Sequence, residues 1–179
     1  MPKLARTNAE AHLFMDLHPC ACGERRFARQ SAVVTLDGDL ASRYTGACAR
    51  CGTERRFEFR IPQEILPPPV SGVRFGGPDP SELFDPGEWL SIADDHAARV
   101  PVGAKLEGDA RRTARHDLDV AVAAIDEILK FAPRGAAEVP MSAFFTPLGR
   151  AIWDKEPGRF RRARLEAVRK AYADAAEKL

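Results

Sequence analysis

The sequence contains no long apolar run. Residues 1–20 lack the apolar stretch of about 7 to 15 residues that marks a secretory signal. No segment approaches the roughly 20 apolar residues that a membrane-spanning helix needs. With 179 residues, the chain is long enough for a small module and a helical body. We therefore expect a globular protein that stays in the cytoplasm and has no membrane partner.

An excess of charge of either sign is also lacking. Lys and Arg total 27 and Asp and Glu total 26, so no overall field draws the chain to nucleic acid or to an anionic membrane. The charges are nevertheless unevenly placed. Residues 24–60 carry eight basic and five acidic side chains, residues 61–158 carry ten and 16, and residues 159–179 carry seven and three. Such alternation suits partners that are steered electrostatically.

Motifs that would indicate catalysis are absent as well. The sequence has no phosphate-binding loop, no nucleophile elbow and no paired-histidine metal motif. Asp94 and Asp95 precede His96, and Asp117 follows His116. Neighbouring positions on a helix point in different directions, so we expect surface histidines rather than a catalytic dyad. The sequence therefore predicts a protein that is not an enzyme.

Four cysteines in two close pairs are the strongest chemical signal. Cys20 and Cys22 stand in His-Pro-Cys-Ala-Cys-Gly, and Cys48 and Cys51 stand in Gly-Ala-Cys-Ala-Arg-Cys-Gly. In a reducing compartment such pairs favour a metal over disulfides, and glycine after each pair permits the positive φ of a tight turn. Tetrahedral thiolate ligation is typical of zinc. The sequence predicts one Zn²⁺ per chain with these four cysteines as ligands.

The first pair has one residue between its cysteines, which is shorter than the usual spacing of two. His18 is therefore an alternative ligand in place of one sulfur. In either case four protein ligands close the coordination shell and leave no position for water or substrate. We expect the zinc to be structural.

Three predicted strands surround the cysteine pairs. Residues 27–36 and 40–44 are expected to form a hairpin around Asp37-Gly38. Residues 55–61 alternate apolar and charged side chains, as a half-buried strand does. Together they predict a three-stranded zinc ribbon.

A connection rich in Pro and Gly divides the chain. The predicted domains are an N-terminal segment with the zinc ribbon at 1–62, the connection at 63–80 and a helical domain at 81–179. The expected helices run over about 86–99, about 107–131, from Ser142 or Thr146 to 153, and about 160–178. The predicted fold class is α+β, a three-stranded zinc ribbon followed by a mainly α-helical body of about four helices.

The clearest helix start lies just after the connection. Asp85 suits the N-cap, Pro86 the first helical position and Glu88 the reciprocal capping position. Phe84 is expected to pack on Trp89, which we place in the core.

The ribbon, the segments Phe75-Gly-Gly-Pro-Asp-Pro and Asp85-Pro-Gly-Glu-Trp-Leu, and the ending Gly149-Arg…Pro157-Gly-Arg-Phe-Arg-Arg-Ala-Arg-Leu-Glu-Ala-Val together resemble an uncharacterised family of bacterial proteins from high-GC genomes. The likeness covers nearly the whole chain. That family has no assigned activity, so the resemblance implies an N-terminal four-cysteine zinc ribbon with a C-terminal helical body and no catalytic residue.

Nucleic-acid binding is one functional hypothesis, because arginines crowd the ribbon and can clamp phosphates. Phe27, Phe57 and Phe59 can stack on bases, although alternating aromatics are more simply a small core. The arginines concerned are Arg25, Arg26, Arg29, Arg43, Arg50, Arg55, Arg56 and Arg60.

The leading hypothesis is a zinc-stabilised, non-enzymatic adaptor or regulatory protein that binds another protein. An inhibitor or immunity-type protein and a regulator of a larger enzyme are two forms of it. The last predicted helix has a basic side that we expect to face solvent. The candidate partner-binding residues are Arg55, Arg56, Arg159, Arg162, Arg169 and Lys170.

Overall fold

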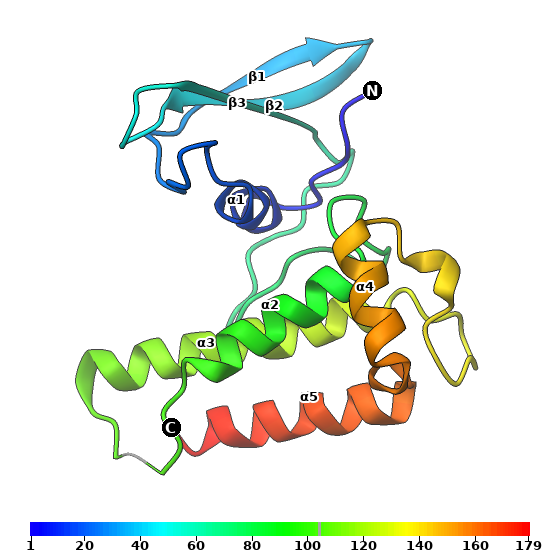
Figure 1. Cartoon of the computed structure of the whole chain (residues 1–179). Coiled ribbons are helices and arrows are strands. Elements are labelled where there is room, and N and C mark those ends of the chain that lie inside the picture. Colours follow the sequence, from blue (N-terminus) through cyan, green and yellow to red (C-terminus); the bar gives the residue numbers. More distant parts are fainter. Residues whose placement is uncertain (104) are drawn as a thin grey trace. The chain divides into compact units, whose positions relative to one another are not determined.

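The computed structural model describes residues 1–103 and 105–179. It has a three-stranded antiparallel sheet followed by α-helices (Figure 1), so the predicted α+β class is confirmed. The expected four helices follow the sheet, and a fifth, α1 (Asn8–Leu17), precedes it. No helix in the described part of the chain is long and apolar enough to cross a membrane.

Helix α1 is missing from the sequence-based prediction, although its start carries a signal. Thr7 is the N-cap, and its hydroxyl accepts a hydrogen bond from the backbone N–H of Glu10 at 3.1 Å. A Thr followed three residues later by a Glu is a typical helix-start pattern. The helix packs on the sheet, where the ring of Phe14 lies edge-on to those of Phe57 and Phe59.

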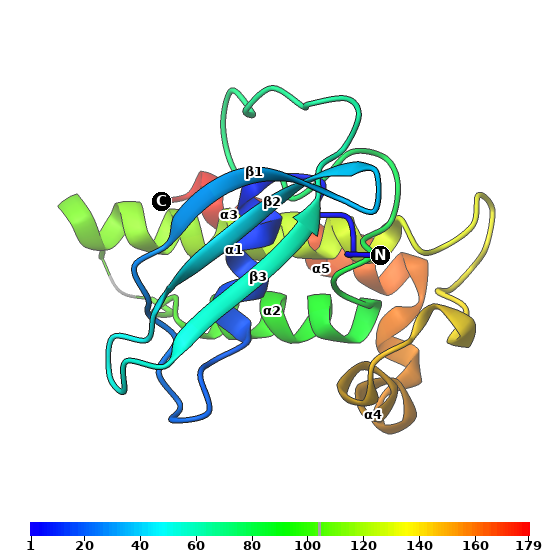
Figure 2. The same cartoon turned by 90° about the horizontal axis from the view of Figure 1, so that it is seen from above.

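The sheet has the order β1-β2-β3 (Figure 2), with β1 at Gln30–Leu36, β2 at Asp39–Ala47 and β3 at Glu54–Arg60. The Asp37-Gly38 turn joins β1 to β2, and both of its residues have positive φ. Two expected boundaries are wrong. The first strand starts at Gln30 rather than at residue 27, and the second continues past residue 44 to Ala47. Phe27 instead forms an isolated bridge with Cys48, which draws that segment toward the cysteines.

The described residues form two compact units, Met1–Pro67 with Ser81–Leu83 and Pro68–Pro80 with Phe84–Leu179. In the first unit, Ser81 donates a hydrogen bond to the buried Glu10 at 2.6 Å. In the second, the ring of Phe75 lies 5.0 Å from that of Trp89. The predicted boundaries at 62 and 80 stay a prediction.

Four α-helices build the second unit. They are α2 (Pro86–Ala98), α3 (Gly108–Leu129), α4 (Pro147–Lys155) and α5 (Arg162–Glu177), with 3₁₀ helices η1 (Met141–Ala143) and η2 (Pro157–Phe160) between them. Thr146 caps α4, while the alternative start, Ser142, lies in η1. The last helix starts at Arg162 rather than near residue 160, because η2 occupies those positions.

The core of this unit follows the sequence patterns. The capping box of Asp85 and Glu88 is present, and the rings of Phe84 and Trp89 lie 4.8 Å apart. Trp89 and Ile125 are fully buried, on α2 and α3 respectively. The apolar stripe of α3 therefore packs inward as expected.

Candidate metal centre

Each cysteine pair lies in a tight turn that ends on a glycine. In the first turn the N–H of Gly23 donates to the carbonyl of Cys20 at 2.7 Å, and in the second the N–H of Gly52 donates to that of Cys48 at 3.0 Å. Gly23 and Gly52 have φ of +88° and +72°, which other residues rarely adopt. Both turns thus close on a glycine, and the second turn is one residue longer than the first.

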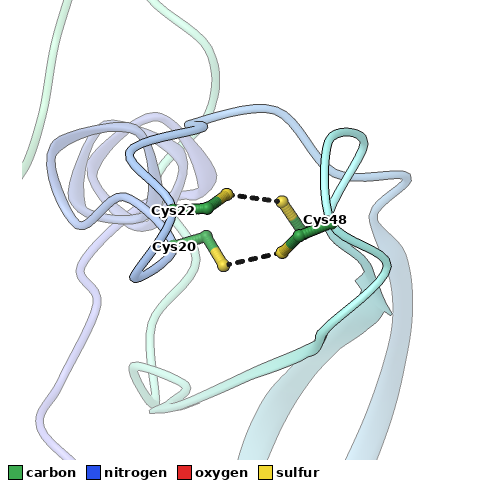
Figure 3. A group of neighbouring side chains, drawn as sticks. Cys20, Cys22 and Cys48 are labelled. Carbon is green, nitrogen blue, oxygen red and sulfur yellow. Dashed lines mark hydrogen bonds between the residues drawn. The ribbon is translucent and has the colours of Figure 1, made fainter.

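The turns bring the four sulfur atoms together. Sγ of Cys20 lies 3.6 Å from Sγ of Cys51, and Sγ of Cys22 lies 3.6 Å from Sγ of Cys48 (Figure 3). All four atoms lie within 4.8 Å of one another. These separations are too long for disulfides. A tetrahedral ion with bonds of about 2.3 Å would separate its ligands by about 3.8 Å, so the four sulfurs are spaced to bind one metal ion.

His18 does not belong to this cluster. Its Nδ1 lies 2.8 Å from the carbonyl oxygen of Phe14, and its ring stacks on that of Phe14 at 3.8 Å. Among the described residues, the four cysteines are the only group of three or more histidines, cysteines or carboxylates near enough to share an ion. The geometry therefore favours four sulfur ligands, despite the short spacing of the first pair.

Arg55 of β3 ties the first turn to the sheet. Its guanidinium donates to the backbone carbonyls of Arg25, at 3.2 Å, and of His18, on either side of Cys20 and Cys22. The guanidinium also lies over the ring of Phe27, 4.8 Å from its centroid. Arg55 is only 7% exposed, so it is part of the frame of the site rather than of its surface.

Gly46 allows the second turn to approach the chain that leads from the first. A Cβ at this position would lie 1.9 Å from the carbonyl oxygen of Ala28. The backbone of β2 can therefore pass close to Ala28 only without a side chain at Gly46. This contact brings both cysteine-bearing segments to one end of the sheet, where the N–H of Ala49 also donates to the carbonyl of Arg26 at 3.1 Å.

Backbone and hydroxyl groups around the thiols favour their charged form. The Thr53 hydroxyl, 3.2 Å from Sγ of Cys51, and the Thr53 N–H lower the pKa of Cys51 to about 6. The pKa of Cys48 is also lowered, mainly by the N–H of Cys51. For Cys22 the N–H of Glu24 lowers the pKa, but desolvation and the neighbouring thiols together raise it to about 11. Crowded thiols cannot all ionise without a cation between them, which is the chemistry of a metal site.

The ribbon arginines lie mostly against acceptors of their own unit. Arg55 is buried, and Arg43 and Arg56 share the carboxylate of Glu58. Phe27 and Phe59 are buried, so these rings belong to the small core, as the simpler interpretation holds. Seven of the eight arginines donate to a carboxylate or a backbone carbonyl: Arg26, Arg29, Arg43, Arg50, Arg55, Arg56 and Arg60.

The basic residues near the C-terminus also have intramolecular partners. Arg159 pairs with Asp94 at 2.7 and 2.8 Å, and Arg169 pairs with Asp126 at 2.5 and 3.0 Å. The first pair joins η2 to α2, and the second joins α5 to α3.

Arg162 and Lys170 complete the predicted set. Arg162 donates to backbone carbonyls, including that of Ala136 at 3.0 Å, and lines an open hollow of about 580 Å³ together with Arg134. Lys170 pairs with Asp174 at 2.6 Å on the exposed side of α5. The basic side chains of the last helix thus bind acceptors within their own unit, and only some of them face solvent as we expected. A role of these residues in binding a partner stays a prediction.

A histidine–aspartate pair occurs where the sequence did not indicate one. Nδ1 of His96 lies 2.7 Å from Oδ1 of Asp117, and the guanidinium of Arg99 lies 3.8 Å from the same oxygen. His96 was expected at the surface because its neighbours in the sequence point in other directions, and it is instead partly buried against Asp117. The packing of α2 on α3 supplies the partner from 21 positions away. No sequence motif marks such a pair.

Comparison with protein-family models, with curated proteins and with solved structures finds no match to this chain. The interpretation of the site therefore rests on its own geometry.

Proposed function

We propose that this chain is a zinc-stabilised, non-enzymatic adaptor or regulatory protein that binds another protein. The observation that carries the proposal is the cluster of four sulfurs, held by two turns that each end on a glycine at one end of the sheet. Zn²⁺ is the ion we expect, one per chain. It accepts four thiolates in a tetrahedron without redox chemistry, and the sulfur separations suit bonds of about 2.3 Å.

The same geometry supports a structural role for the metal. Four thiolates leave no open coordination position for water or a substrate. The ion would instead link the turn before β1 to the turn between β2 and β3. A sheet of only three strands has a small core, so this link supplies stability that burial alone does not.

The arginines of the ribbon favour a protein partner over nucleic acid. A phosphate can be clamped only by a guanidinium that is free to turn toward it. Arg55 is buried, and Arg43 is held by Glu58 at 2.7 Å. Arg60 is likewise held by Glu82 at 2.8 Å. A phosphate would have to displace these internal acceptors, which lowers the gain from binding.

An exposed apolar stretch in the helical unit supports protein binding. Met141, Phe145 and Leu148 are exposed within eight positions, from η1 to the first turn of α4. Several large apolar side chains exposed along one short segment suit contact with another protein. We place the partner site on this stretch, which we name the α4 entry.

The test is to capture the tagged protein from a lysate of its own source, with and without nuclease, and to reconstitute the recovered complex from purified components. We expect a protein that survives nuclease and binds in a fixed stoichiometry. Replacing Leu148 by Glu should weaken its binding about tenfold, the loss of an apolar anchor. Replacing the exposed Asp154, also on α4, by Lys is the control and should change binding little.

Two outcomes would overturn the proposal. One is recovery of nucleic acid alone, lost on nuclease treatment, which would make the ribbon arginines the binding site. The other is turnover of a substrate by a protein that forms no complex.

A further inference from the structure

The outer edge of β1 carries backbone groups that face away from the sheet. The two-residue turn makes Leu36 and Asp39 a hydrogen-bonded pair, and hydrogen-bonded and non-hydrogen-bonded pairs alternate from there along the hairpin. Ser31, Val33 and Thr35 therefore direct their N–H and C=O groups outward. Strand β2 confirms this alternation. Leu40 lies opposite Thr35, and its carbonyl points away from β1 and accepts a hydrogen bond from the N–H of Ile61 at 3.0 Å.

The two edges of the sheet differ in their backbone hydrogen bonding. At β3 the N-terminal segment covers the edge, where Arg60 N–H donates to the carbonyl of Lys3 at 2.9 Å and Ala5 N–H to that of Arg60 at 3.2 Å. At β1 no backbone hydrogen bond within the described residues reaches the outer edge. The strand, Gln-Ser-Ala-Val-Val-Thr-Leu, also has no charge and no proline. Edge strands usually carry such features, because these prevent pairing with another chain.

We propose that β1 pairs antiparallel with β1 of a second copy of this chain, with Val33 opposite Val33 of the partner subunit. This register sets Ser31 opposite Thr35 of the partner subunit, so every outward-facing group finds a complementary one. A shift by two residues in either direction would leave one of the three outward-facing residues without a partner. The result is a continuous sheet across a twofold axis.

The charges beside the strand fit this register. Arg29 precedes β1 and Asp37 follows it, at equal distances from Val33. Antiparallel pairing about Val33 therefore brings Arg29, which also donates to Asp16 of its own chain, near Asp37 of the partner subunit at both ends of the new ladder. Opposite charges facing each other across strands are favourable. No like charges meet, because β1 itself carries none.

The exposed apolar side chains of the hairpin lie on the face that would be extended. Val33 and Leu40 are 66% and 59% exposed. The strand register puts both on the same face as Tyr44 and Phe57, which pack around α1. Pairing of two β1 strands would set Val33 beside its copy and cover part of this apolar surface.

The first experiment measures the dimer dissociation constant by sedimentation of the purified, metal-loaded chain across the micromolar range. Replacing Val33 by Lys places two like charges directly opposite each other and should raise the constant about tenfold. Replacing Leu40 by Lys is the matched control. It makes the same change on the same face, at similar exposure, but on the central strand, so the constant should change less than about threefold.

A second measurement tests the register. As concentration rises and dimers form, amide exchange should slow at Ser31, Val33 and Thr35, while Ala32 and Val34 are already protected by β2. The proposal is overturned if the chain is a monomer throughout, if both lysine variants act alike, or if the dimer leaves those three amides unprotected. A foreign peptide that protects them while the chain alone stays monomeric would equally overturn self-pairing.

Discussion

The carboxylate of Asp85 joins the starts of two helices through Thr146. Its Oδ2 accepts hydrogen bonds from the backbone N–H and the hydroxyl of Thr146, at 2.8 and 2.7 Å. Its Oδ1 accepts from the N–H groups of Gly87 and Glu88, both at 3.0 Å. Asp85 is fully buried. Four donors thus satisfy one buried carboxylate and set the position of α4 against α2.

Replacement of Asp85 by Ala should lower the free energy of unfolding by about 3 kcal/mol, because it removes a helix cap and leaves buried donors unpaired. Urea unfolding followed by tryptophan fluorescence measures this, since Trp89 and Trp153 both lie in the helical unit. Asp154→Ala, an exposed change on α4, is the control and should cost less than about 0.5 kcal/mol. Equal effects of the two variants would contradict a capping role.

Replacement of Cys48 or Cys51 by Ser should abolish stoichiometric zinc and unfold the ribbon, because a structural metal contributes its binding energy to folding. Metal analysis of the unaltered chain should give one ion per chain. The tryptophan signal of the helical unit should persist in both variants, since neither tryptophan lies in the ribbon unit. Full zinc content together with unchanged amide exchange in β1–β3 would argue against the site.

Zinc affinity should rise with pH near neutrality. The pKa of Cys22 is raised to about 11, so this thiol is protonated at about pH 7 and must lose its proton when the metal binds. The pKa of Cys51 is lowered to about 6, so it is already mostly thiolate. Each proton released makes the apparent affinity rise about tenfold per pH unit. Competition with a chelator at several pH values gives this slope.

The same measurement on Thr53→Val tests the cause of the low pKa of Cys51. Loss of the hydroxyl should move that pKa upward and increase the number of protons released at about pH 7. Calorimetric titration in buffers of different ionisation enthalpy counts these protons. An unchanged number of released protons would show that the backbone N–H of Thr53 alone is enough to lower the pKa of Cys51.

Replacement of Arg55 by Ala should destabilise the ribbon by about 2 kcal/mol, because the buried guanidinium holds the carbonyls of His18 and Arg25 beside the first cysteine turn. The neighbouring Arg56 is exposed and pairs with Glu58. Arg56→Ala should therefore cost less than about 1 kcal/mol. Zinc release to a chelator, measured at increasing urea concentrations, reports the stability of the ribbon. Similar release from both variants would contradict the role assigned to Arg55.

The pair of Arg169 with Asp126 should contribute about 0.5 kcal/mol, since both side chains are partly exposed and screened by solvent. Arg169→Glu should destabilise the helical unit by more than this, because it sets two carboxylates together. Adding Asp126→Arg should restore most of the loss. A double-mutant cycle in urea gives the coupling. If the two substitutions show no coupling energy, the pair does not hold Arg169, and Arg169 would again be a candidate for binding a partner.

Local signals in the sequence were sufficient for much of the fold. The cysteine turns, the Asp37-Gly38 hairpin and the capping box at Asp85 depend on residues close together in the chain. Their conformations follow from backbone preferences at those positions. Helix α1 is missing from the prediction although Thr7 and Glu10 carry a start signal, because a helix of ten residues gives only a short apolar pattern. Strand ends were misplaced by up to three residues, because neighbouring strands rather than composition decide where pairing stops.

The sequence by itself determined which residues are able to bind a metal, where the hairpin turns and where the helices begin. Only the tertiary structure decided that His18 turns away to Phe14, that Arg55 is internal, that His96 meets Asp117, and that one edge of the sheet is covered and the other open. The physical reason is the distance along the chain over which each interaction acts. Turn and cap energies act over a few residues, whereas a side chain's exposure and partners depend on segments brought together from tens of positions away.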